Sequence, residues 1–293
     1  MADIKTLTSG GVTRYIKDEA ARNDIDLLKK QGNQAFGGRN LADLFASEIA
    51  HYDSEWEWIQ DRCDGKYLRD LMVRDYLPLT LTTAEQTEQQ IAGINCYYDT
   101  TDEAVGYHID FISRDCMATT VKWNTSNNNN GNATNAAPYM VSNLRTWLLG
   151  TVYPTLPASV KDVITNKRYL MGSRYSASGT LTDDTTWSWQ DLGAIWVPSE
   201  YEVFGSVIWG TKGYGQGQAM QYPIFANNWI DRIKGAGKDG SRCSWWTLTP
   251  VSGYSTYAVF VNYHGYADNY GDASSYAHTS GEYRAPLCFR VSA

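Results

Sequence analysis

Pairs of ionisable side chains two residues apart are the first places in this sequence where chemistry could be expected. His108 and Asp110, in the segment YHID, would point to the same face of a strand and could serve acid–base catalysis or metal binding. Glu200 and Glu202 have the same spacing, but the two carboxylates of a glycosidase normally come from different elements at a set separation. We therefore interpret His108 as a hydrogen-bonded structural histidine, and the two glutamates as structural or surface residues.

A cluster of oxygen-bearing side chains lies near the C-terminus. Asp268, Asn269 and Asp272 could bind Ca²⁺ weakly, although the spacing of an EF-hand is missing. Asp and Asn are also ordinary loop residues, so we predict no metal and no cofactor. The segment GYGQGQ, residues 213–218, lacks the Lys-Ser/Thr of a phosphate-binding loop, and we interpret it as a surface loop.

The cysteines and one tryptophan pair complete the candidates. The five cysteines are widely spaced and form no Cys-x-x-Cys pair, which is typical of free, buried thiols in a protein assembled in a reducing cytoplasm. They are Cys63, Cys96, Cys116, Cys243 and Cys288. Trp245 and Trp246 could stack on sugars, but such a pair more often straddles a strand, with one ring in the core and one nearer the surface.

The segment from Gly253 to Tyr283 has the most unusual composition. It consists almost wholly of Tyr, Ser, Asn, Asp, Gly, Ala, His and Thr, and contains no Lys, Gln or Met. Tyr supplies a large contact area at low entropic cost, and small polar side chains supply adaptable hydrogen bonds. This composition favours a recognition surface over a plain loop. Within it, Val259, Phe260 and Val261 are expected to form a buried strand flanked by polar, aromatic loops.

The first half of the chain is expected to hold these residues on helices and strands. A short strand near Tyr15 should lead into a helix, and the Gly- and Asn-rich residues 31–40 indicate a domain boundary near residue 40. Helical character should follow from residue 41 and end near Gly65. The runs LPLTLT, QIAGINCYY and YHIDFIS then predict strands.

The second half alternates loops, helices and short aromatic segments. Residues 124–137 form a polar loop with nothing to bury. A helix should begin after Ser142 as its N-cap and stop before Pro154, and another is expected over Ala158–Thr165. Beyond residue 168, Gly, Pro and Ser interrupt the chain every few residues, which suits an irregular β domain with long loops.

Charge and hydropathy exclude two kinds of partner. The net charge is -7 and no basic stripe appears, whereas nucleic-acid binders need clustered Lys and Arg. No window of about 18 apolar residues exists, so we predict no membrane insertion. The N-terminus has no basic region followed by an apolar run, and we expect no secretion signal of its own.

The N-terminal segment SGGVTRYIKDEAARNDIDLL resembles a segment common in bacteriophage tail and tail-fibre proteins, in which the string TYDIKDAxAR opens the chain. The matching residues are Thr13, Tyr15, Ile16, Lys17, Asp18, Ala20, Ala21 and Arg22. Arg14 and Glu19 depart from the string. The resemblance implies that residues 1–40 attach the protein to other phage tail proteins or mediate oligomerisation.

The remainder, from about residue 45, is similar to phage and prophage proteins with a C-type lectin-like domain, including the variable proteins of diversity-generating retroelements. The strings that carry the similarity are NLRTWL, LGAIWVPSEYEVFG, QYPIF, the WW of CSWWTLTP, and RAPLCFRV. The similarity implies an α+β fold in which residues 41–293 form a C-type lectin-like domain. Such a domain is an irregular, mostly antiparallel sheet with two helices and long loops.

In that family the segment between the WW string and the final strand is mutated at adenines of its template. Asn codons randomised at adenines give Tyr, Ser, Asp, His, Thr, Gly and Ala among others, but never Lys, Gln, Glu, Met or Trp, which fits the composition of residues 253–283 apart from Glu282. The implied ligand-binding residues are Ser252, Tyr254, Ser255, Tyr257, Asn262, Tyr263, His264, Tyr266, Asp268, Asn269 and Tyr270. Calcium-dependent sugar binding is not implied, because the Glu-Pro-Asn and Gln-Pro-Asp strings are absent.

These resemblances imply a non-enzymatic receptor-binding protein of a phage tail, assembled in the bacterial cytoplasm and located in the virion. Its ligand would be a protein or glycan of the bacterial surface, and we expect a homo-oligomer, a trimer. One alternative is an enzyme like the formylglycine-generating relatives of this fold, which use reactive cysteines in a pocket; Cys243 and Cys288 would then be the residues to test. Another is a virion decoration protein that has no receptor.

Overall fold

In this computed structural model, the described residues are 6–9, 12–15, 38–99, 105–129, 137–172, 187–210, 220–226, 229–278 and 281–293. The chain divides into two compact units, Met1–Arg39 and Asn40–Ala293. In the first unit, β1 (Thr6–Ser9) and β2 (Val12–Tyr15) form an antiparallel hairpin. The strand predicted near Tyr15 is therefore present, and the helix predicted after it lies outside the described residues.

The second unit begins with three short helices, α2 (Leu41–Leu44), α3 (Ala46–Ile49) and α4 (Glu55–Asp64). Ser54 caps α4 by accepting a hydrogen bond from the backbone of Glu57 at 3.1 Å, and the helix ends before Gly65, as predicted. Its buried Trp56 packs edge-on against Phe111 and Phe289, with ring centroids 5.4 and 5.3 Å away. This contact fixes α4 on the first sheet.

The first sheet has the strand order β3-β4-β5-β16-β6, with β9 also pairing β16, and all its pairs are antiparallel. The strands are β3 (Tyr76–Thr80), β4 (Gln86–Ile94), β5 (His108–Cys116), β6 (Ile164–Thr165), β9 (Ile195–Trp196) and β16 (Pro286–Ser292). The strands β3 and β5 match two of the predicted runs, whereas β4 overlaps the run QIAGINCYY only over residues 90–94. The C-terminal strand β16 lies at the centre, so the end of the chain completes the core.

A helical connection joins β5 to β6. It consists of η1 (Pro138–Val141), α5 (Asn143–Trp147), the π-helical turn η2 (Leu148–Val152), η3 (Tyr153–Thr155) and α6 (Ala158–Lys161). Ser142 accepts a hydrogen bond from the backbone of Arg145 at 3.1 Å, which confirms the predicted N-cap of α5. The helix predicted over Ala158–Thr165 is too long, because α6 ends at Lys161. Ile164 and Thr165, the last two residues of the predicted helix, instead form β6 and pair with β16.

The second sheet has the order β13-β12-β11-β15-β14, with β10 pairing β11; the β11–β15 pair is parallel and the others are antiparallel. Its strands are β10 (Lys234–Gly235), β11 (Arg242–Pro250), β12 (Tyr257–Val261), β13 (Ala267–Asp272), β14 (Ala277–His278) and β15 (Gly281–Arg284). The predicted strand Val259–Val261 lies in β12 and is fully buried.

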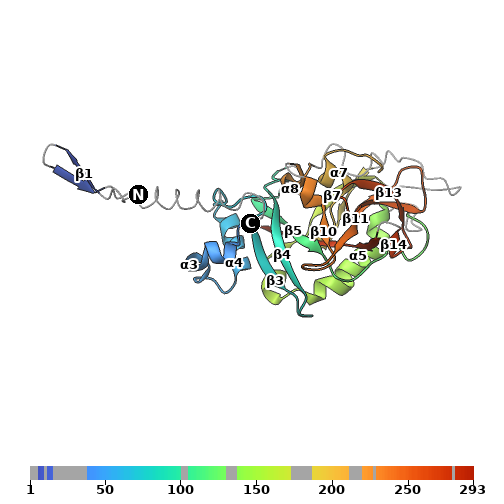
Figure 1. The fold of residues 1–293 in the computed structure, drawn as a ribbon, viewed down its shortest axis with the longest axis horizontal. Helices are drawn as coiled ribbons and strands as arrows, with labels where there is room; N and C mark the ends of the chain where they lie inside the picture. Colours follow the sequence, from blue (N-terminus) through green and yellow to red (C-terminus); the bar gives the residue numbers. More distant parts are fainter. Residues whose placement is uncertain are drawn as a thin grey trace. The chain divides into compact units, whose positions relative to one another are not determined.

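The remaining elements are the hairpin of β7 (Arg168–Gly172) and β8 (Trp187–Asp191) and the short helices α7 (Glu200–Phe204), α8 (Pro223–Ala226) and η4 (Trp229–Arg232). Figure 1 follows the chain from α3 and α4 in blue through β3, β4 and β5 to β11 and β13 in orange and red. The mixed architecture with mostly antiparallel sheets is the predicted α+β class. The described residues contain more than the two helices expected, and the longest, α4, has 10 residues.

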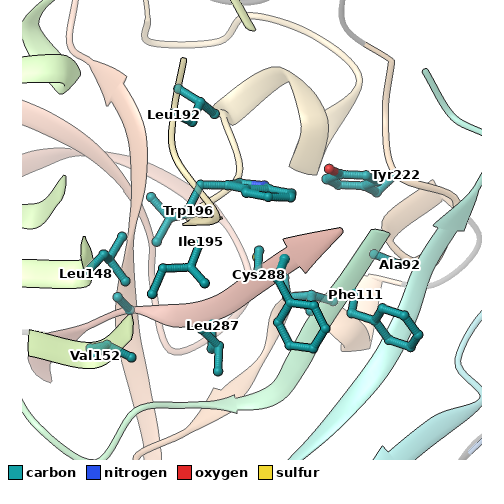
Figure 2. Packing of buried hydrophobic residues seen from close by; sticks show 14 of the residues in the cluster. Ala92, Phe111, Leu148, Val152, Leu192, Ile195, Trp196, Tyr222, Leu287 and Cys288 are labelled. Carbon is teal, nitrogen blue, oxygen red and sulfur yellow. The ribbon is translucent and has the colours of Figure 1, made fainter. Parts of the chain in front are cut away.

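The core is aromatic and continuous between the elements. Figure 2 shows Ile195 and Trp196 of β9 close to Leu287 and Cys288 of β16, with Leu148 and Val152 of η2 on the same side as Ile195. All of these side chains are almost completely buried. Packing of this density holds side chains in single rotamers, so the sheets provide a rigid support for the loops they carry.

Candidate functional site: a groove beside β13

A groove of about 680 Å³ lies where three segments meet beside β13: residues 208–210, 251–254 and 267–270. The residues lining it are Ile208, Trp209, Gly210, Val251, Ser252, Tyr254, Ala267, Asp268, Asn269 and Tyr270. Its volume lies within the range of about 300 to 1,000 Å³ that is usual for small-ligand sites. Four aromatic or large apolar side chains and several polar groups face the same space.

Trp209 makes three hydrogen bonds, two of which connect the three segments of the groove. Its backbone carbonyl accepts from the backbone of Ser252 at 2.8 Å, and its indole nitrogen donates to the carbonyl of Ala267 at 3.2 Å. Its backbone nitrogen donates to a carboxylate oxygen of Glu200 at 2.9 Å. The main chain and ring of Trp209 are thus both held in place, although 41% of the residue is exposed.

Glu200 is the buried support of the 208–210 segment. Its two carboxylate oxygens accept hydrogen bonds from the backbone nitrogens of Trp209 and Gly210, both at 2.9 Å, and the residue is fully buried. Burial raises the pKa of Glu200 above its ordinary value, and the hydrogen bonds from these backbone groups partly oppose that shift. Glu200 therefore has a structural role and is not a surface residue.

Glu202 is structural as well. It closes a capping box with Ser199 at the start of α7 and forms a buried ion pair with Lys167. Its carboxylate also accepts a hydrogen bond from the hydroxyl of Tyr97 at 2.5 Å. Neither glutamate is among the described residues that line the groove.

The structure divides the predicted ligand-binding residues into two groups. Five of them line the groove: Ser252, Tyr254, Asp268, Asn269 and Tyr270. Tyr257 lies behind them, with its ring 5.6 Å from that of Tyr254 and 6.0 Å from that of Tyr270. The three tyrosines thus form one continuous aromatic wall.

The second group occupies the turn between β12 and β13 and does not line the groove. The side chain of Asn262 accepts hydrogen bonds from the backbones of His264 and Tyr266 at 3.0 and 3.2 Å, which stabilises the turn. The ring of Tyr263 lies 3.9 Å from that of His264. Tyr266 is 64% exposed, so its ring is presented to solvent.

The polar loop that starts at Asn124 contributes to the site in a way the sequence did not reveal. Asn129 is fully buried, and its amide group donates to the carbonyl of Tyr254 at 2.7 Å and to the carbonyl of Tyr257. Its backbone nitrogen donates to the carbonyl of Ser255 at 2.6 Å. The prediction that this loop has nothing to bury is wrong at Asn129, because that side chain satisfies the backbone of residues 254–257.

The acidic side chains of β13, Asp268 and Asp272, accept hydrogen bonds from residues two positions further along the chain. Asp268 accepts a hydrogen bond from the backbone of Tyr270 at 3.2 Å, and Asp272 accepts from the backbone and hydroxyl of Ser274, both at 2.9 Å. Among the described residues, no group of three His, Cys, Asp or Glu side chains has the arrangement of a metal site. The interpretation of Asp268, Asn269 and Asp272 as loop residues is wrong, because this segment pairs with β12 and forms the strand β13.

Trp245 and Trp246 do not form a stacking platform. Both are fully buried, and their indole nitrogens donate to the carbonyls of Arg232 and Val121, each at 2.8 Å. The prediction that one ring lies nearer the surface is wrong because β11 is covered on both faces. Phe225 stacks on Trp245 with centroids 6.2 Å apart, and Tyr283 packs on Trp246 at 4.0 Å.

His108 and Asp110 are also structural. His108 is buried with one ring nitrogen 2.8 Å from the carbonyl of Gly106 and the other accepting from the backbone of Tyr97 at 3.1 Å; burial lowers its pKa. Asp110 pairs with Arg290 at 2.7 and 2.9 Å. Burial alone would raise the pKa of Asp110, but the charge and hydrogen bonds of Arg290 outweigh it and lower the pKa to about 2.

All five cysteines are free and buried, as predicted. Burial raises the pKa of Cys63 and that of Cys96 to about 12, and it raises the pKa of Cys288 further. Cys243 donates to the carbonyl of Gly235 at 3.3 Å. The thiol form is therefore favoured at Cys288, which is the opposite of what a reactive cysteine needs.

The residues that sequence reasoning missed are Ile208, Trp209 and Gly210, together with their support Glu200. The string VIWG follows the end of α7 without any period of a helix or strand, so only an exposed aromatic residue beside a glycine could have drawn attention to it. Trp209 lies beside Ser252 and Ala267 because of contacts between segments that are far apart in the chain. A single sequence does not show such contacts.

The fold and site define an α+β protein with an aromatic groove at the edge of its second sheet. Residues 110–290 match a family described as a domain of unknown function, DUF6273, and the chain belongs to this family. The matched range begins at Asp110 and ends at Arg290, the two partners of the buried ion pair. Searches of curated proteins and of solved structures gave no significant match. No helix in the described part of the chain is long and apolar enough to cross a membrane.

Proposed function

We propose that this protein is a receptor-binding protein of a bacteriophage tail, whose C-terminal surface binds a ligand on a bacterial host. The observation that carries the proposal is the exposure of Tyr254, Tyr266 and Tyr270, at 55, 64 and 60%, on loops and a strand that are supported by the fully buried residues 258–261 of β12. Exposed aromatic side chains on a rigid support are typical of interaction sites, because little entropy is lost when they bind.

The finer parts of the proposal rest on the sequence resemblances. A C-type lectin-like fold over residues 41–293 is supported by the mostly antiparallel sheets, short helices and long connections. Residues 1–40 attach the protein to other tail proteins in the virion and hold three copies together. Rewriting of the Tyr-rich segment by a retroelement is supported by its composition, which lacks Lys, Gln and Met.

The enzyme alternative is weakened by the cysteines on which it depends. Cys243 and Cys288 are only 3 and 2% exposed, and burial raises the pKa of Cys288. A thiol that is neither accessible nor ionised is a poor nucleophile. The decoration-protein alternative differs in predicting no binding to cells.

The direct test is saturable binding of the labelled full chain to cells of the bacterium in which the gene resides. The double variant Tyr254→Ala/Tyr270→Ala should weaken binding by roughly thirtyfold or more, the loss expected of hot-spot aromatics. Tyr98→Ala is the matched control, since Tyr98 is 48% exposed and lies outside the predicted surface. Equal losses in both proteins, or no saturable binding to any such cells, would count against the proposal.

The oligomer is tested separately by light scattering. The full chain should have the mass of a trimer, and dilution into a monomeric state should weaken binding to cells because avidity is lost. A monomeric full chain that binds cells with undiminished apparent affinity contradicts the trimer and leaves the receptor proposal intact.

A further inference from the structure

We propose that the groove is a binding site for neutral carbohydrate and that Trp209 is its stacking platform. The inference rests on the proposed function in one respect, since the carbohydrate would belong to the host surface. It goes further by naming the chemical class of the ligand and a contact residue outside the Tyr-rich segment.

Trp209 presents an apolar surface whose one donor is already engaged. Its indole nitrogen is hydrogen-bonded to Ala267, and its main chain is held by Glu200 and Ser252. The exposed part of the side chain is therefore aromatic ring surface. The ring of an aromatic residue packs well against the C–H face of a pyranose, which is apolar, and a ring fixed beforehand loses little entropy when it does so.

The polar groups of the groove match sugar hydroxyls, which both donate and accept. The carboxyl group of Asp268 can accept hydrogen bonds, whereas the side-chain amide of Asn269 offers donors as well as an acceptor. The hydroxyls of Tyr254 and Tyr270 add two more groups of both kinds. A few polar groups within a largely aromatic lining give a small ligand both orientation and affinity.

Charge selects against an anionic ligand. The described residues that line the groove include Asp268 but no Lys, Arg or His, and the whole chain has a net charge of -7. A phosphate or a carboxylated sugar would meet repulsion there without a compensating ion pair. A neutral sugar avoids this cost.

The shape of the site favours a sugar over a protein partner. A stable protein interface spreads over a broad surface of roughly 800 Å² on each partner. This site is instead a concave groove whose volume, about 680 Å³, is that of a small-ligand site. Trp209 also lies outside residues 253–283. Trp209 therefore stays the same when the side chains of residues 253–283 that also line the groove are exchanged.

The experiment compares binding of the full chain to intact cells, to cells oxidised with periodate, and to cells treated with protease. Periodate cleaves the vicinal diols of sugars, so binding should be lost after periodate and kept after protease. Trp209→Ala should weaken binding to untreated cells by roughly thirtyfold. The matched control Trp229→Ala, which removes a tryptophan that is 55% exposed and does not line the groove, should leave binding unchanged.

Binding that survives periodate and is lost after protease overturns the carbohydrate proposal and keeps the receptor proposal, with a protein as the receptor. Equal effects of Trp209→Ala and Trp229→Ala overturn the role of Trp209. Thermal unfolding of each variant checks its fold, and Tyr270→Ser, a change on an exposed ring, replaces Trp209→Ala if that variant does not fold.

A printed array of neutral and acidic oligosaccharides makes the two proposals separable. Binding of the full chain to neutral sugars, lost in Trp209→Ala or Tyr270→Ser, supports the groove even if no cells are bound. Cell binding without any neutral sugar bound on the array and without periodate sensitivity contradicts it. Preference for acidic sugars contradicts the charge argument.

Discussion

At the scale of single residues, Gly210 occupies the tightest position beside the groove. A Cβ atom there would lie 2.3 Å from a methyl carbon of Thr249 and 2.9 Å from the carboxylate of Glu200. Gly210→Ala should therefore lower the free energy of unfolding by about 1 to 3 kcal/mol and displace Trp209. Urea unfolding measures the loss of stability.

The control for Gly210 is Gly150→Ala, because no atom lies within 4 Å of the Cβ position at Gly150. That variant should stay within about 1 kcal/mol of the parent or be slightly more stable, since alanine restricts the unfolded chain. If both variants lose the same stability, the close approach at Gly210 is not the cause.

The buried carboxylate of Asp110 should make the stability of the protein depend on pH in the acid range. Its pKa is lowered from 3.8 to about 2 in the folded state, so as the pH falls the unfolded chain binds the proton first. The stability contributed by this carboxylate is fully present above about pH 4 and is lost toward pH 2. The loss should be about 2 kcal/mol, because one pKa unit corresponds to about 1.4 kcal/mol.

Urea unfolding between pH 4 and pH 2 measures that loss. His108 affects stability in a higher pH range, because burial lowers its pKa below 6.5 in the folded state. The stability that neutral His108 contributes declines as the pH falls below 6.5. The double variant Asp110→Leu/Arg290→Met removes the buried pair together and should show a smaller decline below pH 4. An unchanged decline would assign the acid sensitivity to other carboxylates.

At the scale of elements, the 124–129 loop holds the backbone of residues 254–257. Asn129→Asp would place a carboxylate against the carbonyls of Tyr254 and Tyr257, which now accept hydrogen bonds from the amide. The variant should lose about 2 to 3 kcal/mol of stability. Hydrogen exchange should show faster exchange in residues 251–257 than in the parent.

Asn127→Asp is the control for that prediction, since Asn127 is exposed and carries the same change two residues away. Its stability should stay within about 0.5 kcal/mol of the parent. Faster exchange confined to the 124–129 loop in Asn129→Asp, with residues 251–257 unchanged, would show that the loop does not support the groove.

Sequence reasoning succeeded for elements whose signals are local. The N-cap at Ser142 and the end of α4 before Gly65 depend on neighbouring residues, and the buried run Val259–Val261 depends on three consecutive apolar side chains. Sequence reasoning failed where pairing or packing with strands distant in the chain determines the structure of a segment. Ile164 became a strand because β16 offered a partner, and both Trp245 and Trp246 are buried because β11 is covered on both faces.

The candidate site shows the same limit. Composition pointed to residues 252–270, and the structure places five of the predicted residues in one groove and four in a separate turn. Trp209 belongs to the groove because its carbonyl accepts a hydrogen bond from the backbone of Ser252 and its indole nitrogen donates to the carbonyl of Ala267. Such pairing between segments is set by the tertiary fold and leaves no periodic signal in the sequence.

At the scale of the whole molecule, a buried polar network joins segments that are far apart in the chain. Lys167 pairs with Glu202 and donates to the hydroxyl of Tyr222 at 2.7 Å, and Tyr222 donates to Asp110 at 3.1 Å. Asp110 in turn pairs with Arg290. The network therefore links β5 and β16 of the first sheet to α7 and to the segments that precede β7 and α8.

Lys167→Met should lower the free energy of unfolding by about 3 to 5 kcal/mol, because it leaves Glu202 as an unpaired buried charge. The double variant Lys167→Met/Glu202→Gln should recover part of that loss, since the carboxylate is gone. Thermal or urea unfolding measures both. The exposed Lys238→Met is the control and should change stability by less than about 0.5 kcal/mol. A double variant no more stable than Lys167→Met would contradict the explanation.

The anchoring of residues 254–257 by Asn129 has an evolutionary consequence. Because those hydrogen bonds end on main-chain carbonyls, they do not depend on which side chains Tyr254, Ser255 and Tyr257 carry. Exchanges at these positions change the chemistry of the surface at little cost in folding free energy. Under the proposed receptor-binding function, this arrangement would let the binding surface vary while the fold keeps its stability, which is the condition for rapid adaptation to a changing ligand.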